Sequence, residues 1–81
     1  MSDKEVGSYR EVIRLKSVDD ILRFIKDIGN IEGSLFYRIG YVEISARSLM
    51  NAFSLNLEED ITVTYLGKDV DLFIETMKNY K

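Results

Sequence analysis

Hydrophobic and polar residues alternate at every second position in four stretches of the chain. In residues 9–15, for example, Ile13 and Leu15 share one phase. In residues 61–65, Thr62 and Thr64 fall in the outward phase. This alternation is typical of half-buried strands. The pattern therefore predicts strands at residues 9–15, 34–39, 41–44 and 61–65, with Gly40 at a hairpin turn between the second and the third.

Three other stretches follow the 3.6-residue period of a helix. Ser17 precedes the first, and Asp20 three residues later completes a capping-box pattern. Ser48 precedes the second, which is short, and Asp69 opens the third. Apolar stripes are predicted at Val18, Ile21, Leu22, Ile25 and Ile28 in the first helix and at Val70, Phe73, Ile74, Met77 and Tyr80 in the last.

The order of these elements defines the expected fold. It reads β-α-β-β-α-β-α, which suits an α+β protein with a four-stranded antiparallel sheet. The helices are expected on one face of the sheet, with the other face largely in water. A shorter ferredoxin-like order, without the last helix, is the alternative. Residues 1–8 are predicted to be a flexible N-terminus and residues 9–81 a single domain.

Composition excludes several kinds of protein. The 81 residues include no cysteine and no histidine, which rules out disulfides and makes a metal site a poor prediction. A net charge of −3 does not suit nucleic-acid binding. The first eight residues do not form a signal peptide, and the apolar runs are too short to cross a membrane. This composition fits a cytoplasmic protein, and it leaves the oligomeric state open.

Residues 46–67 resemble part of a known protein family. They read ARSLMNAFSLNL followed by EEDITVTYLG. The first run is similar to the K-S-(I/L)-M-G and S-L-G-L stretch of HPr, the small phosphocarrier of the bacterial sugar phosphotransferase system. The second run resembles the strand that follows it in that family. The resemblance implies an HPr-like open-faced β-sandwich from Tyr9 to Tyr80.

The chain departs from the HPr family at the residue that carries phosphate. HPr uses a histidine at the N-terminus of its first helix, and an ungapped alignment places Ser17 there. Asp19 and Asp20 fall where the family has arginine and proline. A serine phosphate is a stable ester, whereas relay needs a high-energy phosphoramidate. The two carboxylates would also repel a phosphoryl group, and the cations that it needs are expected to be missing there.

The resemblance therefore implies a degenerate member of the family that is not an enzyme. It would act without a cofactor, as a bacterial regulatory or protein-binding module that cannot carry phosphate on histidine. The end of the first helix, at Ser17, is expected to be inert toward phosphate.

Ser48 matches the regulatory serine that a kinase modifies in many HPr proteins. A phosphate at a helix N-terminus would meet free amides and the positive end of the helix dipole. Arg47 adjoins Ser48 and is expected to pair with that phosphate. A plain N-cap role also explains Ser48, and the two roles are compatible.

Leu49, Met50 and Phe53, together with Arg47, are predicted to bind a protein partner through the short second helix. The matching residues of HPr form an exposed apolar patch that partner proteins use. Leu49 and Met50 are neighbours, so they cannot both point inward on a short helix. The alternative is that the helix is tucked down and these side chains belong to the core.

Two further interpretations concern the rest of the surface. The acidic side chains suggest either a cation site or a solvated surface, and no EF-hand spacing supports the cation site. They are Glu58, Glu59, Asp60, Asp69 and Asp71. If the family link is dropped, the chain is a small α/β interaction domain. Such a domain would dimerise through an open sheet face lined by Phe36, Arg38 and Thr62.

Overall fold

A computed structural model of the chain describes residues 7–81, which form four strands and three helices. The strands are β1 (Gly7–Ile13), β2 (Ser34–Ile39), β3 (Val42–Ser45) and β4 (Ile61–Gly67). The helices are α1 (Val18–Ile28), α2 (Leu49–Phe53) and α3 (Val70–Lys78). The predicted order β-α-β-β-α-β-α is confirmed, and the presence of α3 excludes the shorter alternative.

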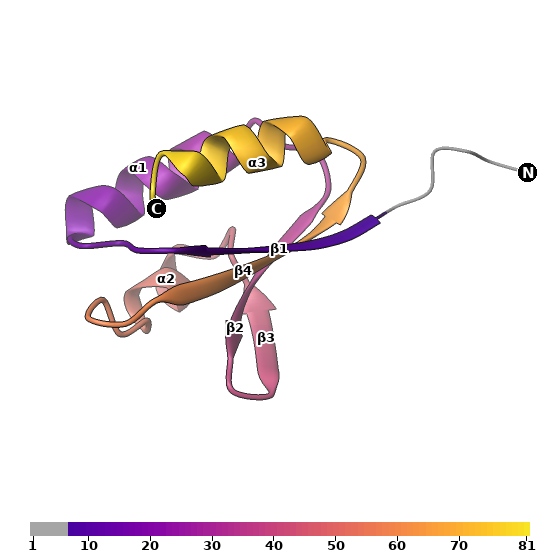
Figure 1. Cartoon of the computed structure of the whole chain (residues 1–81). Helices are drawn as coiled ribbons and strands as arrows, with labels where there is room; N and C mark the ends of the chain where they lie inside the picture. Colours follow the sequence, from indigo (N-terminus) through magenta and orange to yellow (C-terminus); the bar gives the residue numbers. More distant parts are fainter. Residues whose placement is uncertain (1–6) are drawn as a thin grey trace, which may run out of the picture.

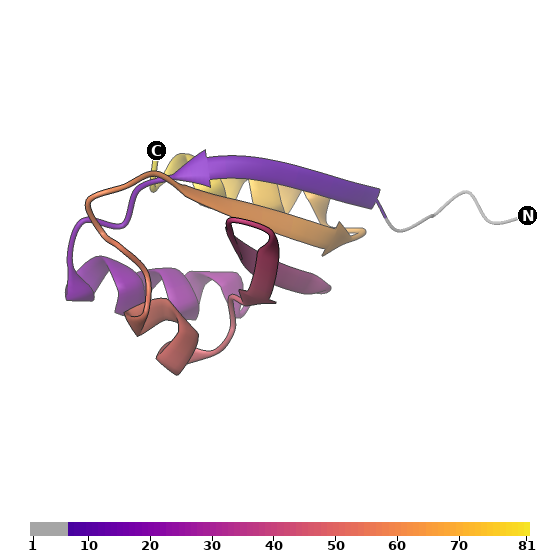
Figure 2. The same cartoon turned by 90° about the horizontal axis from the view of Figure 1, so that it is seen from below.

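The four strands form one antiparallel sheet in the order β1-β4-β2-β3. Figure 1 shows α1 and α3 on the same side of this sheet. The view from below in Figure 2 places β1 and β4 in front of α3. The chain is therefore an α+β open-faced sandwich, which is the predicted fold class and is consistent with an HPr-like arrangement.

The hydrophobic core lies between the sheet and the helices, with the central strand β4 contributing most regularly. Ile61, Val63 and Tyr65 alternate along β4 and are all buried, as predicted. The ring of Tyr65 stacks on Phe73 of α3, with the ring centroids 4.9 Å apart. Because β4 pairs with both β1 and β2, this alternation fixes which face of the whole sheet turns inward.

The apolar stripe of α1 is rotated from the predicted one. The buried residues of this helix are Ile21, Phe24 and Ile28. Val18 and Leu22, which were expected in the stripe, are about half exposed. The ring of Phe24 lies between two others, 6.3 Å from Tyr37 and 5.1 Å from Tyr80 between centroids. These aromatic neighbours come from distant parts of the sequence, and they decide which side of α1 is buried.

The face of the sheet opposite the helices is less open than its polar pattern predicts. Thr64, which was expected to point into water, is buried. The register places Arg10 of β1 and Phe36 of β2 directly beside it. Its hydroxyl donates a hydrogen bond to the Glu43 carboxylate at 2.9 Å. Neighbouring side chains on the outer face thus cover the middle of β4.

The N-terminal strand begins earlier than predicted. Gly7 and Ser8 pair with the last two residues of β4, so they belong to the sheet and not to a flexible segment. Residues 1–6, which were also predicted to be flexible, lie outside the residues that the structure describes. At the other end of the chain, α3 ends at Lys78 and not at Tyr80, although the Tyr80 side chain is buried as predicted.

A polar corner joins the end of β4 to the loop before β2. The Tyr65 hydroxyl donates to the carbonyl oxygen of Glu32 at 2.6 Å and accepts from the backbone N–H of Asp69 at 2.6 Å. The Asp69 carboxylate accepts from the backbone N–H of Glu32 at 3.0 Å. Gly33 follows with φ +120°, and a Cβ there would lie 2.5 Å from the carbonyl oxygen of Leu66. The chain can pass this close to β4 only because residue 33 has no side chain.

Candidate functional site

Ser17 caps the first helix. Its hydroxyl oxygen accepts a hydrogen bond from the backbone N–H of Asp20 at 3.2 Å, as the capping-box pattern predicts. The Asp20 carboxylate accepts in return from the N–H of Lys16 at 2.9 Å, one residue earlier than in a regular capping box. With Asp19 it also places negative charge in the first turn of α1. Side chains of the chain itself thus occupy two of the backbone donors near this helix end, and the carboxylates add repulsion toward a phosphoryl group.

Cations stand closer to this helix end than the sequence analysis expected. A hollow of about 260 Å³ is lined by Arg14, Lys16, Asp20, Arg23, Asn79, Tyr80 and Lys81. Arg23 donates to the Asp20 carboxylate at 2.9 Å, and Lys81 is bonded to the carboxylate of Glu11. The expectation that cations are missing here is wrong. These two cations are nevertheless held by carboxylates of the chain.

Ser48 caps α2 with the same kind of hydrogen bond. Its hydroxyl oxygen accepts from the backbone N–H of Asn51 at 3.2 Å, so the predicted N-cap role is confirmed. The side-chain amide of Asn51 donates to the carbonyl oxygen of Ser45 at 3.1 Å, which fixes the start of the helix to the end of β3. The first turn of α2 holds no acidic residue. This helix end therefore lacks the repulsion toward phosphate that Asp19 and Asp20 create at α1.

Arg47 does not point toward Ser48. Its guanidinium group donates to three backbone carbonyl oxygens: Ile28 at 3.0 Å, Ile31 at 2.6 Å and Gly33 at 2.8 Å. These carbonyls belong to the end of α1 and to the loop that follows it. The expected pairing of Arg47 with a phosphate on Ser48 is not observed, because the side chain is committed to holding this loop. The residue is exposed, and its contact with a partner protein stays a prediction.

The apolar side chains of α2 are exposed. Met50 is 81% exposed, Phe53 49% and Leu49 42%. Ala52 is the buried residue of the helix and belongs to the core. Of the two arrangements that the sequence left open, the exposed patch is therefore the one observed. We call Leu49, Met50 and Phe53 the α2 patch.

The acidic side chains do not converge on one point. The Asp69 carboxylate belongs to the polar corner, and that of Asp60 lies 3.5 Å from the Arg14 guanidinium. Within residues 7–81, no group of three or more histidine, cysteine or acidic side chains is arranged to hold a metal ion.

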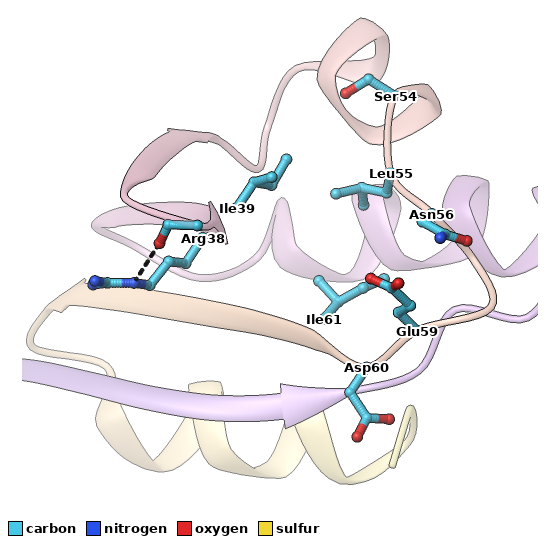
Figure 3. A pocket seen from close by; sticks show the side chains of 9 residues that line it. Arg38, Ile39, Ser54, Leu55, Asn56, Glu59, Asp60 and Ile61 are labelled. Atoms are coloured by element: carbon cyan, nitrogen blue, oxygen red, sulfur yellow. Dashed lines mark hydrogen bonds between the residues drawn. The ribbon is translucent and has the colours of Figure 1, made fainter.

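A cavity of about 360 Å³ lies between the β2–β3 hairpin and the segment that connects α2 to β4. Its lining consists of Arg38, Ile39, Gly40, Ser54, Leu55, Asn56, Glu59, Asp60 and Ile61. Figure 3 shows Ile39, Leu55 and Ile61 around this space and the carboxylate of Glu59 turned toward it. The Arg38 side chain reaches away and donates to the Gly40 carbonyl oxygen at 3.2 Å.

Tyr80 ties the C-terminal end of the chain to α1. Its hydroxyl donates to the Asp27 carboxylate at 2.5 Å. Burial and this hydrogen bond raise the pKa of Tyr80 to about 12. Burial likewise raises the pKa of Tyr37, whose hydroxyl donates to the Ala46 carbonyl oxygen at 3.3 Å. Both tyrosines are therefore neutral structural donors at ordinary pH.

Sequence reasoning missed the anchoring role of Arg47 and the cavity beside Ile39. The carbonyl partners of Arg47 lie 14 to 19 positions earlier in the chain. The cavity joins residues 38–40 to residues 54–61. No local pattern marks either feature, because both depend on how the sheet brings distant segments together.

None of the helices in residues 7–81 is both long enough and apolar enough to pass through a lipid bilayer. Comparisons of the chain with protein-family models, with curated proteins and with solved structures found no match. The resemblance to the HPr family thus rests on the residues quoted above and on the order of the elements.

Proposed function

We propose that this chain is a non-catalytic, HPr-like module of the bacterial cytoplasm that binds a protein partner through α2. The observation that supports this function best is the α2 patch. Leu49, Met50 and Phe53 remain exposed although the helix is anchored through Ala52. Large apolar side chains gathered on one short helix are typical of an interaction surface.

The chemistry of the chain argues against phosphate relay. It contains no histidine, so it has no imidazole nitrogen on which a labile phosphoramidate could form. Ser17, at the expected position, has its hydroxyl engaged in the cap and is followed by Asp19 and Asp20. A regulatory or binding role needs neither an imidazole nor a free phosphate acceptor at this helix end.

Ser48 is the candidate switch of this module. A phosphate on its oxygen would lie at the positive end of α2, beside Met50 and Leu49. Two negative charges at the edge of an apolar patch would change which partners can bind there. Since Arg47 is already bound to three carbonyls, the phosphate would be stabilised by the helix amides and not by this guanidinium.

The switch is tested by incubating the purified chain with an HPr kinase and ATP. We expect one phosphate per chain on Ser48, detected by mass spectrometry of peptides. Ser48→Ala should abolish it, while Ser54→Ala, which alters the exposed serine at the other end of α2, should leave it unchanged. No incorporation into the native chain would remove the switch from the proposal.

The surface is tested by immobilising the chain and comparing Met50→Asp with Leu72→Asp. Leu72 is an exposed apolar residue on α3 and serves as the matched control. We expect the Leu72→Asp variant to retain the same proteins as the native chain, and the Met50→Asp variant to lose them. Identical retention by both variants would contradict a role for α2. A labile phosphoryl adduct after incubation with phosphoenolpyruvate and enzyme I would contradict the non-catalytic assignment.

A second candidate function is dimerisation through the outer face of the sheet. The strand register puts Phe36, Arg38 and Thr62 on this face, with Val12 and Leu66 exposed beside them. Sedimentation equilibrium distinguishes it from the first proposal. A dimer that Leu66→Asp dissociates and Met50→Asp does not would favour the sheet face over α2.

A further inference from the structure

The tip of the β2–β3 hairpin carries an apolar surface that the proposed function does not use. Gly40 turns the chain with φ +60°, and Tyr41 next to it is 98% exposed. Ile39 and Val42 are paired across the hairpin and are both exposed. In Figure 1 the hairpin extends beyond the helices, so no helix covers its tip.

The cavity described above connects this tip to the C-terminal end of α2. Ile39 forms one wall of it, and Leu55, two positions after Phe53 of the α2 patch, forms another. Ile61, at the start of β4, lies across from them in Figure 3. Its volume of about 360 Å³ is near the lower end of the roughly 300–1,000 Å³ that is usual for binding pockets. Three of its nine lining residues are aliphatic and the rest are mostly polar, so the space can receive an aliphatic side chain with room beside it for a neighbouring charged group.

The rim of the cavity is negatively charged. The Glu59 carboxylate faces the space, and Glu58 precedes it in the sequence. Within residues 7–81 neither of them takes part in an ion pair, whereas Asp60 is partly compensated by Arg14 at 3.5 Å. The one cation in the lining, Arg38, is directed away toward the Gly40 carbonyl oxygen. An incoming cation would therefore find free carboxylates at this edge.

We propose that the cavity receives a leucine-like side chain of a partner protein, and that a lysine or arginine next to it on the partner pairs with Glu59. The partner segment would continue over Tyr41 on one side and over the α2 patch on the other. This inference rests on the proposed function, because it extends the α2 surface and specifies what it binds.

The experiment uses three capped tripeptides as probes of the full chain labelled with ¹⁵N. The probes are acetyl-Arg-Leu-Arg-amide, acetyl-Arg-Ser-Arg-amide and acetyl-Glu-Leu-Glu-amide. We expect saturable NMR shifts of the Gly40, Leu55 and Asn56 amides with the first peptide at millimolar concentration. The second peptide should bind at least about fivefold more weakly because it lacks the apolar side chain. The third should be weakened similarly because its charges are reversed.

Matched variants locate the contact. Ile39→Ser should weaken the first peptide about fivefold, and Leu72→Ser, on α3, should not change its affinity. Glu59→Gln should weaken it about two- to fivefold, in line with an exposed ion pair, and Glu75→Gln should not. Since Ile39 and Glu59 are exposed, an unchanged amide spectrum can verify that each variant remains folded.

Equal affinity for all three peptides, the absence of shifts at 10 mM peptide, or shifts confined to another face would overturn the inference. These outcomes are distinguishable from failure of the proposed function. Phosphorylation of Ser48 and the retention that Met50→Asp abolishes do not depend on the cavity. Binding through α2 with an empty cavity would refute the inference alone.

Discussion

The two serine caps of this protein make the same hydrogen bond but have opposite surroundings. Ser17 and Ser48 each accept a hydrogen bond from the amide three residues ahead at 3.2 Å. Ser17 is followed by Asp19 and Asp20, whereas α2 has no acidic residue in its first turn. A helix N-terminus therefore does not by itself define a phosphate site, because neighbouring charges decide whether an anion is accepted.

The caps also differ in what holds their helices in place. α1 has 11 residues and buries three of them, while α2 has five residues and buries Ala52. The start of α2 is held in place by two polar side chains. Arg47 binds the loop after α1, and Asn51 binds the end of β3. Polar contacts to neighbouring segments thus replace buried apolar area at α2, and this arrangement leaves its outer face free.

The largest expected effect on stability comes from removing the hydrogen bonds by which Arg47 holds the loop after α1. Arg47→Met should lower the free energy of unfolding by about 2–4 kcal/mol, because three carbonyl oxygens lose a charged donor. Arg47→Lys should recover less than half of it, since an ammonium group cannot reproduce the planar fork. Urea denaturation measures both, with Lys26→Met on α1 as control. A loss below about 0.5 kcal/mol for Arg47→Met would contradict the anchoring role.

A smaller effect is expected where α1 is held by Tyr80. Tyr80→Phe should cost about 1.5 kcal/mol at neutral pH, because the buried hydroxyl donates to the Asp27 carboxylate. The pKa of Tyr80 is raised to about 12, while an unfolded tyrosine titrates near 10. Its stabilisation is therefore complete below pH 10 and is lost as the pH rises through 12. Between pH 9 and 12, the free energy of unfolding should fall less steeply with pH for Tyr80→Phe than for the native chain. Denaturation at several pH values measures this slope, and identical slopes would argue against the assignment.

The comparison of the caps is sharpened by adding one negative charge to each. Aspartate caps helices about as well as serine, so the substitution mainly tests the electrostatic surroundings. Ser48→Asp should leave stability unchanged or raise it by about 0.3–1 kcal/mol, and Ser17→Asp should lower it by a similar amount. Thermal denaturation at low and high salt measures the difference, which salt should reduce. Equal effects at the two positions would show that Asp19 and Asp20 do not matter.

The smallest expected change in stability belongs to the α2 patch. Met50→Asp should alter the free energy of unfolding by less than about 0.5 kcal/mol, because the side chain is 81% exposed. Ala52→Asp, two positions further along α2 and buried, should cost several times more. Chemical denaturation of the two variants side by side provides the measurement. Comparable losses would indicate that Met50 packs against the protein.

Local patterns predicted what depends on neighbouring residues. The element order, the caps at Ser17 and Ser48 and the turn at Gly40 follow from contacts within a few positions, and the structure contains all of them. The burial of Thr64 and the inward position of Phe24 were missed. Both are decided by partners on other strands or at the chain end, and so they depend on tertiary structure that periodicity does not encode.

The candidate site shows the same division. Exposure of Leu49 and Met50 followed partly from their being neighbours on a short helix. Arg47 was assigned to phosphate because it adjoins Ser48, yet its side chain extends to a loop more than a dozen positions away. Adjacency in sequence did not reveal this direction. A long flexible side chain is the kind of residue for which such inference is weakest.

The close passage of Gly33 beside β4 limits how this protein can diverge. Any side chain at position 33 would collide with the Leu66 carbonyl, and the φ of +120° would be strained as well. Relief would require β2 to shift away from β4, which would also move the carbonyl that Arg47 holds. A single hydrogen atom in place of a methyl group thus preserves the spacing of the central strands, and homologous sequences would be expected to keep glycine at this position.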